Sequence, residues 1–351
     1  MAEISIIPES IKLLKMDDSE YFSSKYKEYI SNSKLGLINP DEGGSIELFL
    51  SPYKESYSDS LELGSALHAN LLQPESYIIS DIEKPNGKLG IWAEKVFDLR
   101  KEGYSLKDSF YIASEQADYY AKKLVNTRLK SAIRNSLPFY LKRIAFEQDV
   151  NKKTIFLSAP LREKYLNCLL NINNSTSKVL DTLYPPGMFS VAEFHNEYAL
   201  FCDLQYVDTE TGEITILKFK SKFDNYTIDH ELKEIVLNDV KSSSKPASYF
   251  MGNNVTSRNE NDELITVWYN GSFQKYRYYR QIGVYMWLLQ SALKHLHNIE
   301  DYSYKANIIV IETAPEYKNK VYPISASYIR EGLKEFKNLL KLVVDAKTNR
   351  P

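Results

Sequence analysis

The chain reads Ile235-Val236-Leu237-Asn238-Asp239-Val240-Lys241-Ser242-Ser243-Ser244-Lys245 at the point that decides its fold. The first three residues form a short apolar run that is typical of a buried β-strand. Asp239 and Lys241 lie two positions apart, so their side chains point to the same face of that strand. A carboxylate and an ammonium group at the end of a buried strand are costly unless they bind something. A divalent cation and a water molecule to be activated would use both groups, so this stretch is a candidate catalytic site.

The pattern Asp-x-Lys is a weak signal by itself, because it occurs by chance in many chains of this size. The alternative is an exposed ion pair worth about 0–1 kcal/mol. The three serines and Pro246 end the strand and open it to solvent. The choice between the two interpretations therefore depends on what the rest of the chain supplies.

The composition is that of a globular protein, with 43% hydrophobic and 26% charged residues among 351. No run of about 18 apolar residues is present and the first residues lack the features of a signal peptide, so we expect a cytoplasmic protein without a membrane partner. Cys168 and Cys202 are too few to hold a zinc ion or an Fe–S cluster, and we expect two reduced core thiols. The net charge of −2 neither favours nor excludes a nucleic-acid partner, because only a local concentration of positive charge would matter.

Helical patterns dominate the first part of the chain. We expect residues 1–44 to form a helical extension, with a peripheral helix over 17–32. A stronger helix is predicted over 60–72, and its core-facing stripe repeats at i, i+4 and i+8 as Leu63, Leu67 and Leu71.

A basic helical insertion is expected over about 90–150. Residues 119–146 contain seven lysines and arginines and no acidic residue. Lys123, Lys130 and Arg134 fall near one helical face. Such a run is equally well a solvated helix face or the local basic patch that a DNA path requires.

A β region follows the helices. Residues 190–207 and 214–223 are strand-like, and the turn over 208–213 joins them into a predicted hairpin. We expect Asp224 at the end of the second strand, and the stretch quoted above supplies a third. The polar residues 251–263 are expected to form a loop.

The last part of the chain alternates helix and strand. A long helix over 273–293 would place Gln281 and Tyr285 one turn apart, and it is followed by a strand over 306–312 and a helix over 327–345. This order predicts an α/β fold in which helices flank a mixed β-sheet, with an added helical part.

Four segments carry a resemblance to a known family. They are Glu62-Leu-Gly-Ser-Ala-Leu-His68 with the following Leu71-Leu-Gln-Pro-Glu75, Glu193 at the start of the hairpin, Phe223-Asp224 followed by Asn238-Asp239-Val240-Lys241, and Tyr276-Arg277-Tyr278-Tyr279-Arg280-Gln281 with Tyr285. In this order they resemble the PD-(D/E)XK nuclease superfamily, and within it the RecE-like phage exonucleases related to lambda exonuclease and to the RecB nuclease domain.

The resemblance implies the restriction-endonuclease-like core of that superfamily. It implies one nuclease domain over 45–346 that carries the basic insertion, with a tail at 347–351. The chain departs from the family pattern where Phe223 replaces the signature proline, and the step of 15 residues from Asp224 to Asp239 is long. Asp203 is therefore an alternative for the first acid.

The implied cofactor is a hard cation, Mg²⁺ or Mn²⁺. Asp224 and Asp239 would hold it through oxygen, with the Val240 carbonyl as a candidate third ligand. The alternative is a pair of solvated turn carboxylates. His68 would bind the metal or orient its water, although a histidine on an apolar helix is more often a satisfied core residue.

The same resemblance assigns roles to polar residues around the metal. Lys241 would aim the attacking water and offset charge in the transition state. Gln281 would fix the nucleophile or a ligand carboxylate, since an amide both donates and accepts. Glu193 would bind a second metal or the 5′ end, and it is equally well a strand-edge charge. Arg277 and Arg280 would reach phosphates.

The function implied by the resemblance is a 5′→3′ exonuclease acting on double-stranded DNA ends. The family also implies a homo-oligomer and a single-strand annealing protein as partner in phage recombination. Two alternatives stay open. One is another nuclease of the superfamily, either an endonuclease or a single-strand-specific enzyme. The other is a DNA-binding scaffold that keeps the fold and has lost catalysis.

Overall fold

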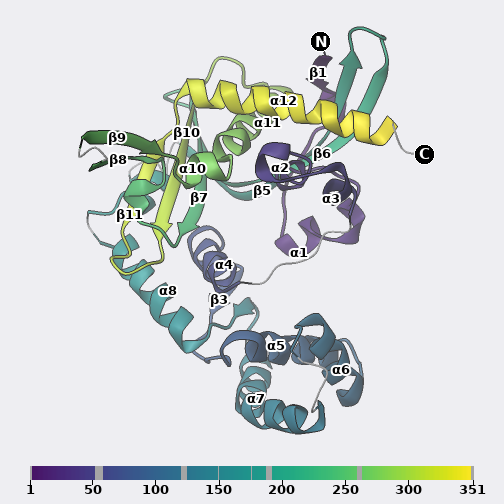
Figure 1. Cartoon of the computed structure of the whole chain (residues 1–351), viewed down its shortest axis with the longest axis vertical. Coiled ribbons are helices and arrows are strands. Elements are labelled where there is room, and N and C mark those ends of the chain that lie inside the picture. The colour runs from purple at the N-terminus through teal and green to yellow at the C-terminus, as the bar shows by residue number, and fades with distance from the viewer. Residues whose placement is uncertain are drawn as a thin grey trace. The chain divides into compact units, whose positions relative to one another are not determined.

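The computed structural model describes residues 2–51, 58–119, 125–148, 150–174, 176–186, 192–258 and 263–348. The chain divides into two compact units, of which one is Met1–Glu55 with Asn171–Pro351 and the other is Ser56–Leu170 (Figure 1). We had expected one domain over 45–346 with an insertion at about 90–150. The second unit begins earlier than that insertion and includes the helix predicted over 60–72.

A mixed seven-stranded sheet forms the centre of the first unit. Its strands follow the order β1-β5-β6-β7-β10-β11, and β2 also pairs with β5. Among the described strands of this sheet, β7 and β10 pair in parallel and the other pairs are antiparallel. The strands are β1 (Ala2–Ile6), β2 (Lys12–Lys15), β5 (Ala192–Asp208), β6 (Ile214–Asp229), β7 (Glu234–Ser243), β10 (Ser303–Glu312) and β11 (Asn319–Pro323). The predicted α/β fold with a mixed sheet and flanking helices is confirmed.

The hairpin of β5 and β6 is longer than the sequence predicted. Asp224 does not end the second strand, because β6 continues to Asp229. The extra residues pair with β7 from Asn225 opposite Asn238 to Asp229 opposite Glu234. The polar residues in this extension gave no sequence signal for a strand. Its backbone nevertheless pairs with β5 on one side and with β7 on the other.

The first 44 residues contain strands that we did not predict. β1 and β2 both pair with β5, and Ile4 of β1 is buried in the core. The helix expected over 17–32 is replaced by two short pieces, α1 (Asp18–Tyr21) and η2 (Ser24–Tyr26). The other short helices of this part are η1 (Pro8–Ser10), α2 (Asn32–Gly36) and η3 (Pro40–Glu42). Ser45 caps α3 (Ile46–Leu50), because its hydroxyl accepts a hydrogen bond from the Leu48 N–H at 3.2 Å.

Two long helices cover the sheet in this unit. They are α11 (Tyr278–His297) and α12 (Ala326–Thr348) (Figure 1). Gly283 of α11 and Gly332 of α12 lie where the two helices meet. A Cβ at Gly332 would lie 2.0 Å from the Tyr279 carbonyl oxygen, and one at Gly283 would lie 2.6 Å from that of Ile329. The glycines therefore permit the close approach.

The single helix predicted over 273–293 is broken in the structure. A short helix, α10 (Ser272–Lys275), precedes Arg277, whose φ of 53° lies in the left-handed region, and α11 starts after it. The remaining elements of this unit are α9 (Val179–Leu183), η4 (Ala247–Tyr249), β8 (Asn253–Arg258) and β9 (Leu264–Tyr269).

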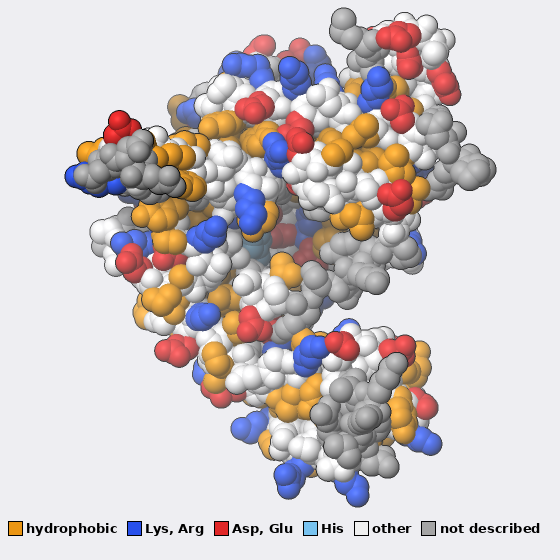
Figure 2. Space-filling view, in the orientation of Figure 1, with side chains coloured by type: hydrophobic (Ala, Val, Ile, Leu, Met, Phe, Trp, Pro, Cys, Tyr) orange, Lys and Arg blue, Asp and Glu red, His pale blue; other side chains and the backbone are white. Residues whose placement is uncertain are grey.

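The polar stretch 251–263 is not a loop throughout, because β8 pairs with β9 as an antiparallel hairpin. Cross-strand contacts such as Thr256 with Thr266 at 2.9 Å replace the apolar alternation that would have revealed a strand. The exposed Leu264, Trp268 and Tyr269 place hydrophobic side chains on this hairpin, at the left of Figure 2.

The second unit has its own core. Trp92, Phe139 and Phe156 are buried together, and Trp92 donates to Ser114 Oγ at 2.9 Å. Its elements are α4 (Asp59–Leu72), β3 (Tyr77–Ile79), α5 (Gly87–Lys101), α6 (Leu106–Gln116), α7 (Val125–Gln148) and β4 (Lys153–Ile155), and α8 (Ala159–Ile172) runs to its boundary. The predicted helix over 60–72 is confirmed with its buried leucine stripe. Among the described residues, no helix combines the length and the apolar character needed to cross a membrane.

Candidate active site

Three carboxylates stand at neighbouring positions on three adjacent strands. Asn196 pairs with Asn225 and Tyr198 with Phe223, so Glu197 of β5 lies opposite Asp224 of β6. Asn225 pairs with Asn238, so the next positions along are Asp224 and Asp239 of β7. Each acid is therefore the chain neighbour of an asparagine in the same cross-strand row.

The asparagines form a continuous ladder of amide hydrogen bonds. Asn307 of β10 donates to Asn238 at 2.9 Å, Asn238 to Asn225 at 2.7 Å, and Asn225 to Asn196 at 2.8 Å. Asn196 in turn donates to the Tyr184 hydroxyl at 2.7 Å. Asn225 and Asn238 are fully buried, where unpaired amides would be costly, so the ladder fixes the register of four strands. It thereby sets where the three acids lie.

The carboxylates of Glu197 and Asp224 are close enough to bind the same metal ion. A carboxylate oxygen of each lies within 4.8 Å of the other. The backbone of Glu197 has a φ of 58°, a left-handed conformation that is uncommon for glutamate. Such strain inside a strand often accompanies function, because packing must hold it in place.

Asp224 also marks the point where β6 and β7 part. The register between them ends at Asn225 and Asn238, and beyond it the Val240 N–H donates to Asp224 Oδ2 at 2.7 Å. The carboxylate takes the place of a strand partner, which orients Asp224 toward β7.

Asp239 is buried and is held by two side chains. The Lys241 ammonium lies 2.7 Å from its Oδ2, and Gln281 of α11 donates to its Oδ1 at 3.2 Å. Burial alone would lower the pKa of Lys241, but the Asp239 and Asp224 carboxylates outweigh it and raise the pKa. The two carboxylates therefore favour the protonated form of Lys241.

Aromatic rings close the site on the helix side. Gln281 also donates to the Tyr285 hydroxyl at 2.9 Å, and the Lys241 ammonium lies 5.3 Å from the centre of the Tyr278 ring. Burial, reinforced by the Asp239 charge, raises the pKa of Tyr285 well above its usual value. Tyr285 stays a neutral hydroxyl that fixes the glutamine amide.

Lys222 offsets the negative charge of Glu197, the acid on β5. Its ammonium pairs with Glu197 and lies 2.5 Å from Asp18 Oδ1. Burial lowers the pKa of Lys222, and the two carboxylates more than offset this effect, so the pKa is raised. The carboxylates of the group still outnumber its two lysines.

A hard divalent cation fits this donor set. Mg²⁺ and Mn²⁺ prefer carboxylate and carbonyl oxygens, and a cation about 2.1–2.4 Å from each of two oxygens can join atoms up to about 4.8 Å apart. Glu197 and Asp224 meet that condition. Asp239 lies beside them, and the ammonium groups of Lys222 and Lys241 do not neutralise all of the carboxylates. These side chains therefore suit a bound cation.

The structure does not bring Glu193 to this group. Glu193 pairs with Ile228, four residues along β6 from Asp224, which is about 13 Å at the rise of a strand. Its carboxylate contacts His195 and His230 instead. Asp203 pairs with Lys218, six residues from the Asp224 position, so Asp224 is the acid beside Asp239.

The sequence contained little that would have selected Glu197. Glu193 and Glu197 lie four residues apart on one strand, so their side chains are expected on the same face and the sequence does not distinguish them. The left-handed backbone at Glu197 is visible only in the structure. The one usable signal was its position directly after Asn196, matching the Asn-Asp pair at 238–239.

The two arginines of the helix motif are engaged within the protein. Arg280 is 2% exposed, and its guanidinium binds Glu42, Glu335 and Asn32. This geometry argues against the phosphate contact that we expected for it. Arg277 is less buried and pairs with Asp41 at 3.3 Å.

Other predicted residues belong to the second unit. His68 lies on α4 and is partly buried, and its metal role stays a prediction. Lys130 and Arg134 are exposed on α7. Lys123 lies outside the described residues. Arg143 of the same basic run is not exposed, because it pairs with Asp98 and Glu147.

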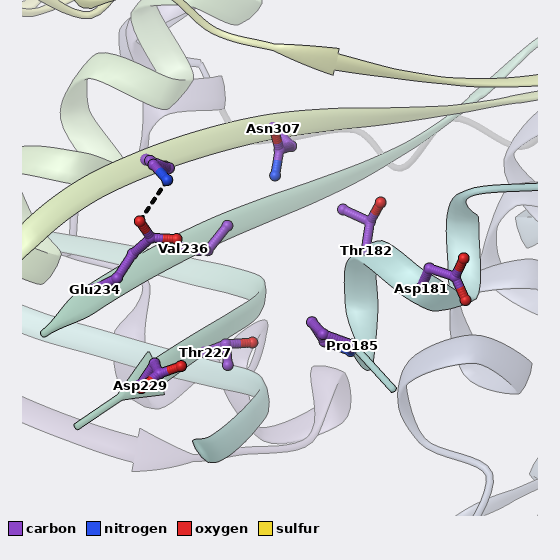
Figure 3. A pocket seen from close by; sticks show the side chains of 9 residues that line it. Asp181, Thr182, Pro185, Thr227, Asp229, Glu234, Val236 and Asn307 are labelled. Atoms are coloured by element: carbon purple, nitrogen blue, oxygen red, sulfur yellow. Dashed lines mark ion pairs between the residues drawn. The ribbon is translucent and has the colours of Figure 1, made fainter. Parts of the chain in front are cut away.

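A cavity of about 230 Å³ lies between α9 and the strands β6, β7 and β10 (Figure 3). Glu234 and Lys305 pair at one side of it, and Asn307 of the ladder points into it. None of the three site acids lines it. The candidate chemistry therefore does not take place in this cavity.

Comparisons with known proteins add little to this geometry. No protein-family model matches the chain, and no curated protein matches it. A crystal structure from Eubacterium rectale named "Putative exonuclease" is similar over 95% of this chain and 87% of its own, with a TM-score of 0.46 and 11% identity. The case for a function therefore depends on the side chains of the sheet.

Proposed function

We propose that this chain is a metal-dependent nuclease that hydrolyses the DNA backbone and that it acts as a 5′→3′ exonuclease on duplex ends. The observation that carries the proposal is the row of Glu197, Asp224 and Asp239 on adjacent strands, with Lys241 on the same strand as Asp239. Two lysines offset part of the negative charge of these three carboxylates, and a metal cation would offset the remaining repulsion between them. The order of motifs along the sequence supports the finer assignment to the RecE-like exonucleases.

The three acids would hold Mg²⁺ or Mn²⁺, with the Val240 carbonyl as a further ligand. A cation there would polarise a phosphate oxygen and lower the pKa of a bound water. The Gln281 amide donates to Asp239 and so fixes the direction of its oxygens. The Val240 N–H does the same for Asp224.

Lys241 acts as a hydrogen-bond donor and a positive charge. The Asp239 and Asp224 carboxylates raise its pKa, which favours its protonated, hydrogen-bond-donating form. Its ammonium can neutralise charge that develops on the phosphate and hold the attacking water by donating to it. The proton of that water must then leave to solvent or to a carboxylate.

The partners in this proposal follow from the motif resemblance. They are duplex DNA ends, further copies of the chain in a homo-oligomer, and a single-strand annealing protein, all in the cytoplasm of a host cell. Sedimentation of the purified chain measures the oligomeric state directly.

Two glutamates on one strand supply a matched test. Glu197→Gln removes a proposed ligand, while Glu193→Gln makes the same chemical change four residues away on an exposed side chain. With linear duplex and Mg²⁺ we expect a loss of at least about 100-fold for Glu197→Gln and near wild-type cleavage for Glu193→Gln. EDTA should abolish wild-type cleavage. Equal rates for wild type and Glu197→Gln, both resistant to EDTA, would refute the proposal.

End-labelled substrates separate the finer alternatives. Release of label from the 5′ end before the 3′ end, with closed circular duplex left intact, is the expected result. Cleavage of the circle would identify an endonuclease. Binding of DNA without cleavage, together with no heat of Mn²⁺ binding, would identify the scaffold alternative.

A further inference from the structure

A group of aromatic rings lies between Lys241 and the surface of the first unit. Phe250 stacks against both Tyr278 and Tyr322, with ring centroids 5.5 and 5.9 Å away. The Tyr276 ring lies 5.9 Å from that of Tyr278. Phe250 is buried, whereas Tyr276 is 53% exposed and the other two tyrosines are half-buried. Packing on a buried phenylalanine therefore keeps the three tyrosines together at the surface.

Each of these tyrosines has a lysine ammonium near its ring. The distances from nitrogen to ring centroid are 5.3 Å for Lys241 and Tyr278, 5.4 Å for Lys275 and Tyr276, and 4.7 Å for Lys320 and Tyr322. All three fall within the range of cation–π attraction, which extends to about 6 Å. Rings and cations are therefore interleaved, and we call these six residues the lysine–tyrosine patch.

Two of the three lysines face solvent. Lys241 contacts the Asp239 carboxylate. Lys275 and Lys320 are exposed, and neither pairs with a carboxylate of the residues that the structure describes. Exposed ammonium groups of this kind attract a polyanion.

The patch adjoins the candidate active site. Lys241 belongs to both, because its ammonium contacts Asp239 on one side and the Tyr278 ring on another. A DNA strand with a phosphate at the acids would therefore continue directly onto the patch.

The residue types suit a nucleic acid better than a protein partner. Lysine is depleted at interfaces between proteins. Sites for single-stranded nucleic acid combine aromatic side chains, on which bases stack, with cations that follow the backbone. Bases in a duplex already stack on one another, so an exposed ring such as that of Tyr276 suits an unpaired base.

We propose that the lysine–tyrosine patch binds single-stranded DNA next to the cut, with a base stacked on Tyr276 and phosphates at Lys275 and Lys320. The assignment rests on the proposed nuclease function and adds to it a surface for the unpaired part of the substrate. Since every base has a ring face, this surface accepts any sequence.

The test measures binding of fluorescent oligothymidylate to the full chain in EDTA, where metal-dependent cleavage does not occur. We expect Tyr276→Ala to weaken binding at least about 5-fold, because stacking on one ring is lost. Tyr276→Phe keeps the ring and should bind like the wild type. Lys275→Gln combined with Lys320→Gln should reduce the slope of log K against log salt by about 0.7 for each lysine removed.

Two controls separate this surface from general effects. Tyr111→Ala removes an exposed tyrosine of the second unit and should leave the affinity within about 2-fold of the wild type. A blunt duplex of the same length should lose less affinity than oligothymidylate in Tyr276→Ala, because its bases are already stacked. Circular dichroism of each variant confirms that it is folded.

Any of four results would overturn the proposal. They are an unchanged oligothymidylate affinity in Tyr276→Ala, an equal loss in Tyr276→Phe or Tyr111→Ala, an equal loss for the duplex, and an unaltered salt slope in the double lysine variant. Failure of the nuclease proposal is a separate outcome, because it is read from cleavage by Glu197→Gln with Mg²⁺. In EDTA, Glu197→Gln should bind oligothymidylate like the wild type.

Discussion

The Val240 N–H donates to Asp224 Oδ2 at 2.7 Å, and this bond replaces the pairing of β6 with β7 where the two strands part. Asp224 therefore has a structural task in addition to the charge that it brings to the site. A substitution can remove one of these contributions without the other.

Asp224→Asn separates the two tasks. The amide oxygen can still accept from Val240, so we expect stability to change by less than about 1 kcal/mol. Loss of the charge should weaken Mn²⁺ binding at least about 10-fold, as measured by calorimetry. Asp224→Ala removes both and should cost a further 1–2 kcal/mol or so in urea unfolding. An unchanged Mn²⁺ affinity in Asp224→Asn would remove Asp224 from the metal site.

The asparagine ladder predicts a stability loss at Asn225. Asn225→Ala removes the shorter hydrogen bond of the Asn238 amide, which keeps only the Thr182 carbonyl at 3.3 Å, and it removes the donor to the Asn196 side-chain carbonyl. We therefore expect about 2–4 kcal/mol of destabilisation. The matched control is Thr227→Val on the same strand, because the buried Thr227 hydroxyl has no hydrogen-bond partner among the described residues. That change should be neutral or stabilising. Equal losses in urea unfolding for the two variants would contradict the role of the ladder.

Lys220 predicts a rise of stability with pH. Burial, with a smaller contribution from Lys34, lowers the pKa of Lys220 to about 8, whereas the unfolded value is about 10.4. Between these values the unfolded chain binds more protons, so stability increases with pH through this window. Lys220→Met lacks the group. The wild type should therefore gain on the order of 2 kcal/mol relative to this variant between pH 7 and 10, as measured by urea unfolding.

The pH comparison has an internal control. Ionisation of tyrosines that do not contact Lys220 affects both proteins alike and cancels in the difference. A constant difference between the two proteins across the window would show that Lys220 keeps its ordinary pKa.

Arg280 predicts a structural effect where the motif suggested a DNA contact. Arg280→Met leaves Glu42 without its cation and leaves Glu335 only the longer contact to Arg277 at 3.8 Å. Breaking a buried ion pair typically costs about 3–5 kcal/mol. Arg330→Met, at an exposed position on α12, should change stability by less than about 0.5 kcal/mol. A fully stable Arg280→Met with reduced DNA affinity would restore the phosphate role.

Strong local patterns were sufficient to predict part of this structure. The apolar run before Asp239 and the turn at 208–213 gave the hairpin and the third strand, because period and turn chemistry are local properties. The leucine stripe over 60–72 gave α4 for the same reason. Asp239, Lys241 and Gln281 were predicted to lie together, and they do.

The misses came from contacts between distant parts of the chain. β1 and β2 are strands because β5 offers them partners, and β8 is a strand because β9 does. The local sequence of these segments does not predict either pairing. Glu197 joined the site through a left-handed backbone that surrounding packing holds. Arg280 is buried because it pairs with Glu335 of α12 and with Glu42 of the first 44 residues. No motif on its own helix indicated these partners.

The pairing of Ala2 with Asp208 joins chain segments about 200 residues apart. During synthesis β1 therefore cannot pair until β5 has left the ribosome. Until then its backbone N–H and C=O groups have no strand partner in β5. Long-range pairing of this kind slows folding and prolongs exposure to aggregation. Expression at low temperature, or with chaperones that shield nascent strands, should increase the yield of correctly folded chains.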